Sequence, residues 1–378
     1  MARVLLAFEP PDGGVAVNVA QLALGLGALG WEPEVAGPPD AIPYPELERR
    51  GIPIHRLPLG RGYGRPDADA SALARLTALL LGHDFDLIHC HASKVGAIGR
   101  VAALATGTPS VYSPHCFPFA GELHGIWRVA AKLIERALGR LPGEILCVCE
   151  SERQLAMRER IAPAKRLHVV HNGCEPCPEG VAPEPSLAAL AARGPLVGAV
   201  AALRNQKRLD VLIDATPMIL ARVPDAGVAI VGNGPLHEQL RARAARIGLD
   251  AEPRFALLPF TPPAARALAA LDLFVLPSGW EAFPIGVLEA LACGVPQVVS
   301  DVGGSSEAVT PQTGMLVAPE DPLALAEAIV AMLGDAPRRE AAAAASRKRH
   351  AERFGVTRMI AQTAAVYEAV VTPGRSPV

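Results

Sequence analysis

Two glutamates in the stretch SGWEAFPIGVLEALACGVP, residues 278–296, have the type and spacing to do chemistry. Glu281 and Glu289 flank seven residues that include one proline, one glycine and no other charge. Two carboxylates can act as a general acid and base, can bind one ligand together, or can form the solvated edge of an ordinary helix. The elements that hold the pair decide between these interpretations.

The residues before Glu281 read as a buried strand, LDLFVLPS, and those after it as a crossing loop and an apolar helix, IGVLEALAC. Ligands of parallel sheets gather at the carboxyl ends of strands, which is where this loop begins. Glu289 falls two turns into the helix among apolar neighbours, so we expect it to be partly buried and to need a polar partner. Sugar or ribose hydroxyls are suitable partners, because one carboxylate accepts two of them.

The whole chain alternates short apolar runs with stretches of helical period, which predicts an α/β protein. Its 378 residues exceed the length at which one core usually keeps growing. We therefore predict two Rossmann-like, doubly wound domains that face each other across a cleft. Their expected extents are residues 1–178, a proline-dense linker over 179–194, residues 195–355, and a helix over 356–378 that packs back on the first domain before a short tail.

Three cations, Arg204, Lys207 and Arg208, crowd the turn between a strand and a helix in AALRNQKRLD. Cations at a helix N-terminus oppose the helix macrodipole, so they favour a bound anion such as a diphosphate over a plain solvated helix start. No Asp-x-Asp motif follows a strand, which predicts that Lys207, Arg204 and a helix N-terminus supply the charge that a metal ion would otherwise provide.

Three glycines follow strands, where a backbone without a Cβ atom can approach a ligand closely. Gly14 closes the first strand-to-helix turn, and Gly232 with Gly234 lies in the corresponding turn of VGNGPL. The first turn is not a GxGxxG fingerprint, so a dinucleotide dehydrogenase is disfavoured and a plain turn glycine stays an alternative.

Three histidines lie at the ends of strands in the first domain. His115 follows a strand directly, among prolines in VYSPHCFPF, and is expected to project at the carboxyl edge as a site residue. His89 and His91 share one face of a strand in IHCHAS. Either one of them enters the cleft or both are structural histidines, and the sequence leaves the two alternatives open.

The charge balance of the chain argues against nucleic acid as a partner. With 36 basic and 38 acidic residues and a net charge of −2, the chain has no global field that attracts nucleic acid. The N-terminus lacks a signal-type apolar stretch and no run reaches about 18 uncharged apolar residues, so we expect a cytoplasmic protein. Residues 126–141 carry cations at four-residue spacing. This suits peripheral contact with an anionic membrane, or an ordinary solvated face over a buried one.

Seven cysteines are an odd number, which in an intracellular chain favours free or buried thiols over a disulfide framework. Cys174 and Cys177 form a single CxxC without a second such pair or a pair of histidines nearby. We expect this CxxC to be a loop without metal or redox chemistry.

The run EAFPIGVLEALACGVPQVVSDVGGSSEAV resembles the signature of retaining glycosyltransferases of the GT-B fold, family 4, also called glycosyl transferases group 1. VCESERQLA, VVHNG and GNGPL are similar to further landmarks of that family, so the resemblance covers nearly the whole chain. It implies transfer of a sugar from a UDP- or GDP-sugar to a glycan, lipid-linked or small-molecule acceptor, by front-face attack and without cofactor or metal ion. The first domain would select the acceptor through loops such as residues 60–70 and 116–125.

The resemblance also implies roles for single residues. Glu281 would contact the donor sugar near its reacting end and Glu289 the ribose hydroxyls, as binders rather than as an acid and base. Lys207 would bind the diphosphate, and His115 would lie near the sugar. The other implied donor contacts are Gly14 and the backbone amides of Phe283, Pro284, Ile285 and Gly286.

Two positions depart from the family pattern. Ala202 stands where an arginine is usual, so Arg204, two residues later, is the candidate to supply that charge. Ala282 replaces the usual glycine after Glu281. Because of Ala202, a non-catalytic nucleotide-sugar-binding protein stays an alternative, beside a nucleotide-sugar epimerase or hydrolase on the same fold.

Overall fold

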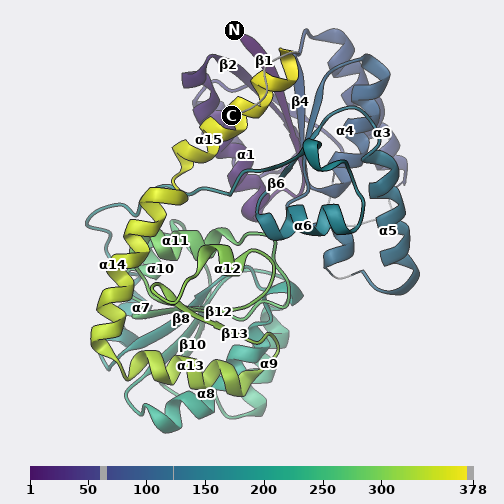
Figure 1. The fold of residues 1–378 in the computed structure, drawn as a ribbon. Helices are drawn as coiled ribbons and strands as arrows, with labels where there is room; N and C mark the ends of the chain where they lie inside the picture. The colour runs from purple at the N-terminus through teal and green to yellow at the C-terminus, as the bar shows by residue number, and fades with distance from the viewer. Residues whose placement is uncertain (60–65, 122, 373–378) are drawn as a thin grey trace. The chain divides into compact units, whose positions relative to one another are not determined.

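The computed structural model describes residues 1–59, 66–121 and 123–372, and the chain divides into two units (Figure 1). The first unit holds residues 1–173 and the C-terminal segment from Val356, and the second holds residues 174–355. Residues 60–65 and 122, which fall in the two loops expected to select an acceptor, lie outside the described residues.

The first sheet has seven parallel strands in the order β3-β2-β1-β4-β5-β6-β7. The side chains of β1 alternate, because successive residues of a strand point to opposite faces. Val4 and Leu6 pack with α1 and α15 on one face, while Leu5 and Ala7 pack with α3 and α4 on the other. The strands are β1 (Ala2–Phe8), β2 (Trp31–Gly37), β3 (Ile54–Arg56), β4 (Leu87–His91), β5 (Ser110–Ser113), β6 (Glu144–Cys147) and β7 (Leu167–Val169).

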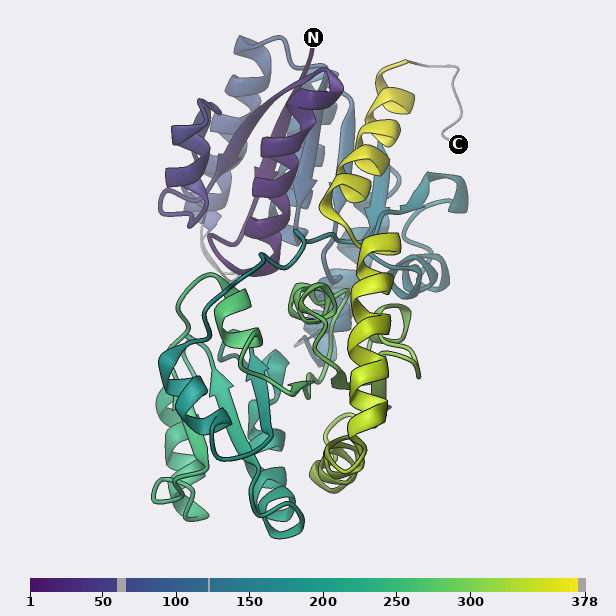
Figure 2. The ribbon, with the colours of Figure 1, turned by 90° about the vertical axis from the view of Figure 1, so that its left-hand side faces the viewer.

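Helices cover both faces of the first sheet, and the last helix of the chain is one of them (Figure 2). In that helix, Tyr367 is fully buried and its ring meets the Trp31 ring edge-on, with centroids 5.2 Å apart. The helices of this unit are α1 (Gly13–Gly25), η1 (Leu26–Leu29), α2 (Tyr44–Arg49), α3 (Pro66–Gly82), α4 (Ser93–Thr106), η2 (Pro118–Ala120), α5 (Gly125–Leu138), α6 (Glu150–Arg158), η3 (Ala164–Arg166) and α15 (Val356–Val371).

The second sheet has six parallel strands in the order β10-β9-β8-β11-β12-β13, with a core of aliphatic side chains between the sheet and α8, α9 and α13. The strands are β8 (Leu196–Val200), β9 (Gly227–Val231), β10 (Phe255–Leu258), β11 (Leu273–Leu276), β12 (Gln297–Ser300) and β13 (Gly314–Val317). The helices are α7 (Pro185–Ala191), η4 (Asn205–Lys207), α8 (Leu209–Arg222), α9 (His237–Arg246), α10 (Ala264–Leu268), α11 (Ile285–Cys293), α12 (Ser305–Ala308), α13 (Pro322–Leu333) and α14 (Ala336–Arg353).

The stretch expected as a linker, residues 179–194, belongs to the second unit. The division between the units falls between Gly173 and Cys174 rather than after residue 178. Within the stretch, α7 forms and Leu187 is fully buried. The proline-dense stretch therefore lies close to the boundary, but it contains a helix that is anchored by Leu187 and by the contacts of Glu184 with Arg266.

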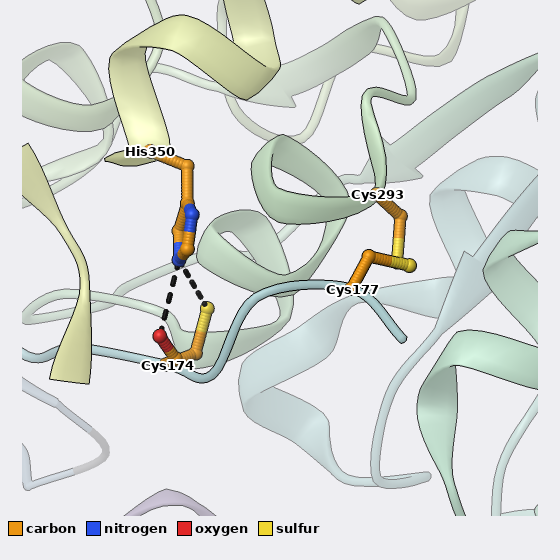
Figure 3. Close-up of a disulfide and its surroundings, with 4 residues drawn as sticks. All are labelled: Cys174, Cys177, Cys293 and His350. Carbon is orange, nitrogen blue, oxygen red and sulfur yellow. Dashed lines mark hydrogen bonds between the residues drawn. A yellow bond between two sulfur atoms is a disulfide. The ribbon is translucent and has the colours of Figure 1, made fainter. Parts of the chain in front are cut away.

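The cysteine expectation was wrong for two of the seven residues, because Cys177 and Cys293 form a disulfide within the second unit (Figure 3). Cys174 is not part of it. Its thiol lies 3.3 Å from Nε2 of His350, and burial raises the pKa of that thiol. Of the two cysteines of the CxxC, Cys177 is therefore in a disulfide and Cys174 is a buried thiol. The disulfide partner of Cys177 lies 116 residues away in the sequence.

Each sheet has one place where the strand order reverses direction. It falls between β1 and β4 in the first sheet and between β8 and β11 in the second. In open α/β sheets, ligands bind in the crevice outside the carboxyl ends of the strands at such switch points. The loops that follow β8 and β11 hold Lys207, Glu281 and their neighbours, so the fold brings the predicted site residues to the expected place.

Candidate active site

A largely buried ion pair joins the two loops at the switch point of the second sheet. Lys207 Nζ donates to Oε1 of Glu281, and the side chains are 18% and 6% exposed. Ser278 Oγ donates to the same oxygen at 2.8 Å, and Gln206 Nε2 donates to Oε2 at 3.0 Å. The carboxylate of Glu281 is therefore oriented by three donors. The roles of Gln206 and Ser278 were not foreseen from the sequence.

Backbone contacts fix the loop that carries Glu281. The Gly279 N–H donates to the Gln206 carbonyl at 2.9 Å, and Gln206 Nε2 donates to the Trp280 carbonyl at 3.1 Å. Gly303, after β12, has a φ of +53° and lies so close to the Glu281 carbonyl that a Cβ atom would overlap it. This close approach explains the glycine in the VGG part of the signature run.

Phe283 and Ala282 anchor the same loop at its far end. Both are buried, and the Phe283 ring packs against that of Phe354 with centroids 5.4 Å apart. Helix α11 begins directly afterwards, at Ile285, with Pro284 before it. Pro284 was among the residues expected to bind a diphosphate through a backbone amide, but proline has no N–H. Amide donors in this part of the loop can come from Phe283, Ile285 and Gly286 only.

Glu289 has a different environment from Glu281, although one loop and two helical turns separate them. It is half-buried on α11, and no hydrogen bond or ion pair reaches its carboxyl group from residues 1–59, 66–121 or 123–372. Burial raises the pKa of Glu289 to about 7. A buried carboxyl without partners is costly, which is the arrangement expected of a group that a ligand satisfies.

Arg204 begins the same turn as Lys207. It lines a cavity of about 110 Å³ together with Arg208 and Asp210, and the lining includes neither Lys207 nor Glu281. Arg208 is held by Asp210, with guanidinium to carboxylate distances of 3.1 and 3.2 Å. Of these three predicted cations, Lys207 forms an ion pair with Glu281.

Gly232 and Gly234 bring the β9 loop against the β8 loop. A Cβ atom on Gly232 would lie 2.0 Å from the Ala201 carbonyl, and one on Gly234 would lie 2.6 Å from that of Leu203. The Leu203 N–H also donates to the Asn233 carbonyl at 2.9 Å. These glycines therefore have a visible structural role in seating the loop that leads to Lys207, and their contact with a ligand stays a prediction.

In the first unit, His115 stands directly beyond β5 in a left-handed backbone conformation, with φ +52°, and Cys116 follows with φ +104°. The His115 ring stacks on His91, and its Nε2 lies 2.9 Å from Nδ1 of His91. Burial lowers the pKa of His115 to about 4. Two adjacent non-glycine residues with positive φ are strained, and such strain is concentrated at functional sites.

Glu152 holds this strained turn in place, and sequence reasoning missed it. Its buried carboxylate accepts the Cys116 N–H at 2.7 Å and the Val148 N–H at 2.8 Å, which ties the turn after β5 to the segment after β6. Glu152 lies in the first turn of α6, where Sγ of Cys149 accepts the Glu152 N–H at 3.3 Å. A glutamate three residues after a helix cap was the available sequence signal.

His89 and His91 are both fully buried, which favours the alternative that both are structural histidines. His89 bonds to the Tyr367 hydroxyl at 2.5 Å and to Ser113 Oγ at 2.8 Å. His91 contacts His115, and burial lowers the pKa of both His89 and His91 well below the usual value.

Gly14 lies exposed at the start of α1, beyond β1 at the switch point of the first sheet.

A larger cavity, of about 580 Å³, lies at the opposite ends of the first sheet's strands. Its lining includes Ser110 and Glu144, which begin β5 and β6, together with residues of α4 and α15. His115 follows the carboxyl end of β5, so this cavity lies at the opposite end of that strand from His115.

Two Rossmann-like units, with a cation–carboxylate site at the switch point of the second, define the class of GT-B glycosyltransferases, as the sequence predicted. Residues 194–335 match the family model of glycosyl transferases group 1, and residues 13–173 match that of the glycosyl transferase 4-like domain. The chain therefore belongs to the group 1 glycosyltransferases.

Known proteins of this class are similar over most of the chain. UDP-Gal:alpha-D-GlcNAc-diphosphoundecaprenol alpha-1,3-galactosyltransferase of Escherichia coli is 27% identical over 248 residues, which cover 63% of this chain and 63% of that protein, less than two thirds of its length. D-inositol 3-phosphate glycosyltransferase of Jonesia denitrificans is 27% identical over 402 residues, 94% of this chain and 91% of that one. Anabaena Alr3699/HepE, solved with UDP and glucose, shares the fold at a TM-score of 0.83 and 22% identity, over 98% of this chain and 100% of that one.

Proposed function

We propose that this glycosyltransferase moves a sugar from a UDP- or GDP-sugar to a glycan, lipid-linked or small-molecule acceptor, with retention of the anomeric configuration and without a metal ion. The observation that carries the proposal is the contrast between the two glutamates. Glu281 is held in an ion pair by Lys207, whereas Glu289 is half-buried and has no hydrogen bond or ion pair within the described chain. The ribose of a nucleotide-sugar donor has two hydroxyls that can donate hydrogen bonds to the Glu289 carboxylate.

In this mechanism, cations and helix amides neutralise the departing diphosphate. Lys207 lies at the carboxyl end of the second sheet, and the N-terminus of α11 begins in the loop it contacts. Positive charge placed before the reaction lowers the barrier to a leaving group that gains negative charge. Glu281 contacts the sugar, His115 from the first unit lies near it, and the leaving phosphate takes the proton of the acceptor.

The relatives support the range of donors and acceptors. The Escherichia coli relative is named for a UDP-galactose donor and a diphosphoundecaprenol-linked acceptor, and the Jonesia denitrificans relative for an inositol phosphate. Each of these acceptors is an alcohol that carries a phosphate group. No helix of the described chain is long and apolar enough to cross a bilayer. The proposal places the reaction in the cytoplasm, and the Cys177–Cys293 disulfide is unusual for that compartment.

The test is a panel of UDP- and GDP-sugars incubated with and without a pool of glycan and lipid-linked acceptors, with and without a chelator. We expect free nucleotide to appear only with an acceptor, in the presence of the chelator, and the product linkage to keep the donor's anomeric configuration by NMR. Release of nucleotide without acceptor would instead identify a hydrolase, and a changed sugar that is still attached to its nucleotide would identify an epimerase. Tight donor binding without turnover would identify a binding protein.

A further inference from the structure

Helix α5 is amphipathic in the reverse sense to an ordinary surface helix. A helix on a soluble protein normally buries its apolar face and exposes its polar face. In α5, five of the six large apolar side chains are exposed, whereas its one acidic residue, Glu135, is 3% exposed. The exposed apolar residues are Ile126 (77%), Trp127 (71%), Val129 (55%), Leu133 (57%) and Ile134 (55%).

The buried side of α5 is polar because it is bonded to the rest of the first unit. Glu135 accepts hydrogen bonds from Arg100 at 2.9 Å and from the Tyr112 hydroxyl at 2.9 Å. On the next turn outward, Lys132 and Arg136 both bond to the Glu159 carboxylate, at 2.8 and 3.3 Å. These hydrogen bonds and ion pairs hold the polar side of α5 against the first unit. The opposite, apolar side of the helix therefore faces outward.

The four cations spaced four residues apart therefore do not all face outward, so they cannot form a single row that contacts lipid. They are Arg128, Lys132, Arg136 and Arg140. Lys132 and Arg136 are used internally. Arg128 and Arg140 are exposed, and neither has an ion pair with any described residue. Outward, α5 thus presents an apolar stripe at i, i+7 and i+8 spacing, with an exposed tryptophan, one unpaired arginine near each end and no exposed acid.

We propose that this face of α5, residues 126–140, docks in the interface of an anionic lipid bilayer. An apolar stripe bordered by cations, with a tryptophan, is the combination that lies in the headgroup region of such membranes. At 14 residues the helix is too short to span a bilayer, so it lies along the surface. A second copy of this face is a poor partner, because a two-fold contact would bring like charges together.

Docking of α5 would bring the acceptor side of the site to the membrane. The helix follows the connection that begins at His115, and it lies at the outer side of the first unit beside α3 and α4 (Figure 1). The inference rests on the proposed function in one respect only, that the acceptor is lipid-linked. Binding to vesicles tests the surface without any sugar transfer.

The experiment is co-sedimentation of the full chain with vesicles of phosphatidylcholine alone and of phosphatidylcholine with phosphatidylglycerol. We expect binding to the anionic vesicles, weakened by salt, with a blue shift of tryptophan fluorescence. The double variants Trp127→Gln with Ile126→Gln, and Leu133→Gln with Ile134→Gln, should each lower the partition coefficient by at least about tenfold. Because these side chains are exposed, the variants should keep the wild-type melting temperature.

A matched control is Leu81→Gln on α3 of the same unit, which is also exposed, at 70%, and should bind like the wild type. Arg128→Gln with Arg140→Gln should remove the preference for anionic vesicles. Equal binding by the Trp127 variant and the wild type would overturn the proposal, and so would a dimer that this variant dissociates in sedimentation velocity. If vesicle binding holds while the donor panel shows no turnover, the proposed function fails and the docking surface stands.

Discussion

Lys207 and Glu281 form an ion pair that joins the loops after β8 and β11 at the switch point of the second sheet. The pair leaves Lys207 oriented before any ligand arrives. A preformed charge of this kind needs little reorganisation when a diphosphate departs.

Replacing Lys207 should mainly slow turnover. Lys207→Ala removes the cation and leaves the Glu281 carboxylate without its charge partner, so we expect kcat to fall by about 10²–10³. The affinity for free nucleotide should fall much less. Steady-state kinetics and calorimetric titration of the variant measure the two effects, and a loss of affinity without a loss of kcat would refute the assignment.

Arg204 offers an internal comparison, because it shares the β8 loop but lines a separate cavity. We expect Arg204→Ala to lower kcat by about tenfold, less than Lys207→Ala. Ala202→Arg, which restores the cation usual in this family, should raise kcat. A greater loss at Arg204 than at Lys207 would show that Arg204 carries the main charge despite its position.

Glu152 should affect turnover through His115. In Glu152→Gln, the amide NH2 cannot accept a backbone N–H, so one of the bonds to Cys116 and Val148 is lost and the strained turn loosens. We expect kcat to fall about tenfold with unchanged nucleotide affinity, because the second unit is untouched. Glu150→Gln, two residues earlier on the same helix, is the control and should retain activity. Wild-type kcat in Glu152→Gln would contradict a positioning role.

Glu289 should make the free protein less stable as pH rises. Its pKa in the folded state is about 7, above the ordinary value of 4.5, so the folded state holds the proton more tightly. The contribution of this group to stability is thus full below pH 4.5 and is lost as pH rises to about 7, by on the order of 3 kcal/mol.

Glu289→Gln removes this titration and keeps the shape of the side chain. We expect the variant to unfold like the wild type at pH 4.5 and to be more stable at pH 8, by urea titration at both values. If the free energy of unfolding changes equally between pH 4.5 and pH 8 in the variant and in the wild type, Glu289 is solvated or paired in solution.

The Cys177–Cys293 disulfide should stabilise the second unit. It ties the start of that unit to the C-terminal end of α11, across 116 residues of sequence. Cys293→Ser should lower the free energy of unfolding by about 2–5 kcal/mol, and a reductant should do the same to the wild type only. Thermal melts with and without reductant measure this, and a wild-type melting temperature that ignores the reductant would mean that the bond does not form.

Local patterns predicted the parts of the site that depend on one segment. The strand, loop and helix around Glu281 and Glu289 followed from apolar periodicity, and so did the position of the loop at the carboxyl end of a strand. The partly buried state of Glu289 followed from its apolar neighbours. The donors Gln206 and Ser278 could be placed only by the packing of two loops.

Other features depend on contacts between distant segments, which no single pattern contains. Cys177 finds Cys293 because α11 ends beside the start of the second unit. Helical period showed that α5 is amphipathic, but it does not say which face is covered. That choice was made by the buried charge of Glu135 and by Glu159, which lies beyond the helix.

Calorimetric titration of UDP and GDP into the wild type and Glu289→Ala tests the central claim most directly. If Glu289 accepts the ribose hydroxyls, the preferred nucleotide should bind the variant at least about tenfold more weakly, which corresponds to the loss of a charge-assisted hydrogen bond. The wild-type affinity should also fall below pH 7, as Glu289 gains a proton, and this pH dependence should be absent from the variant. Equal affinity in the two proteins across this pH range would contradict the account.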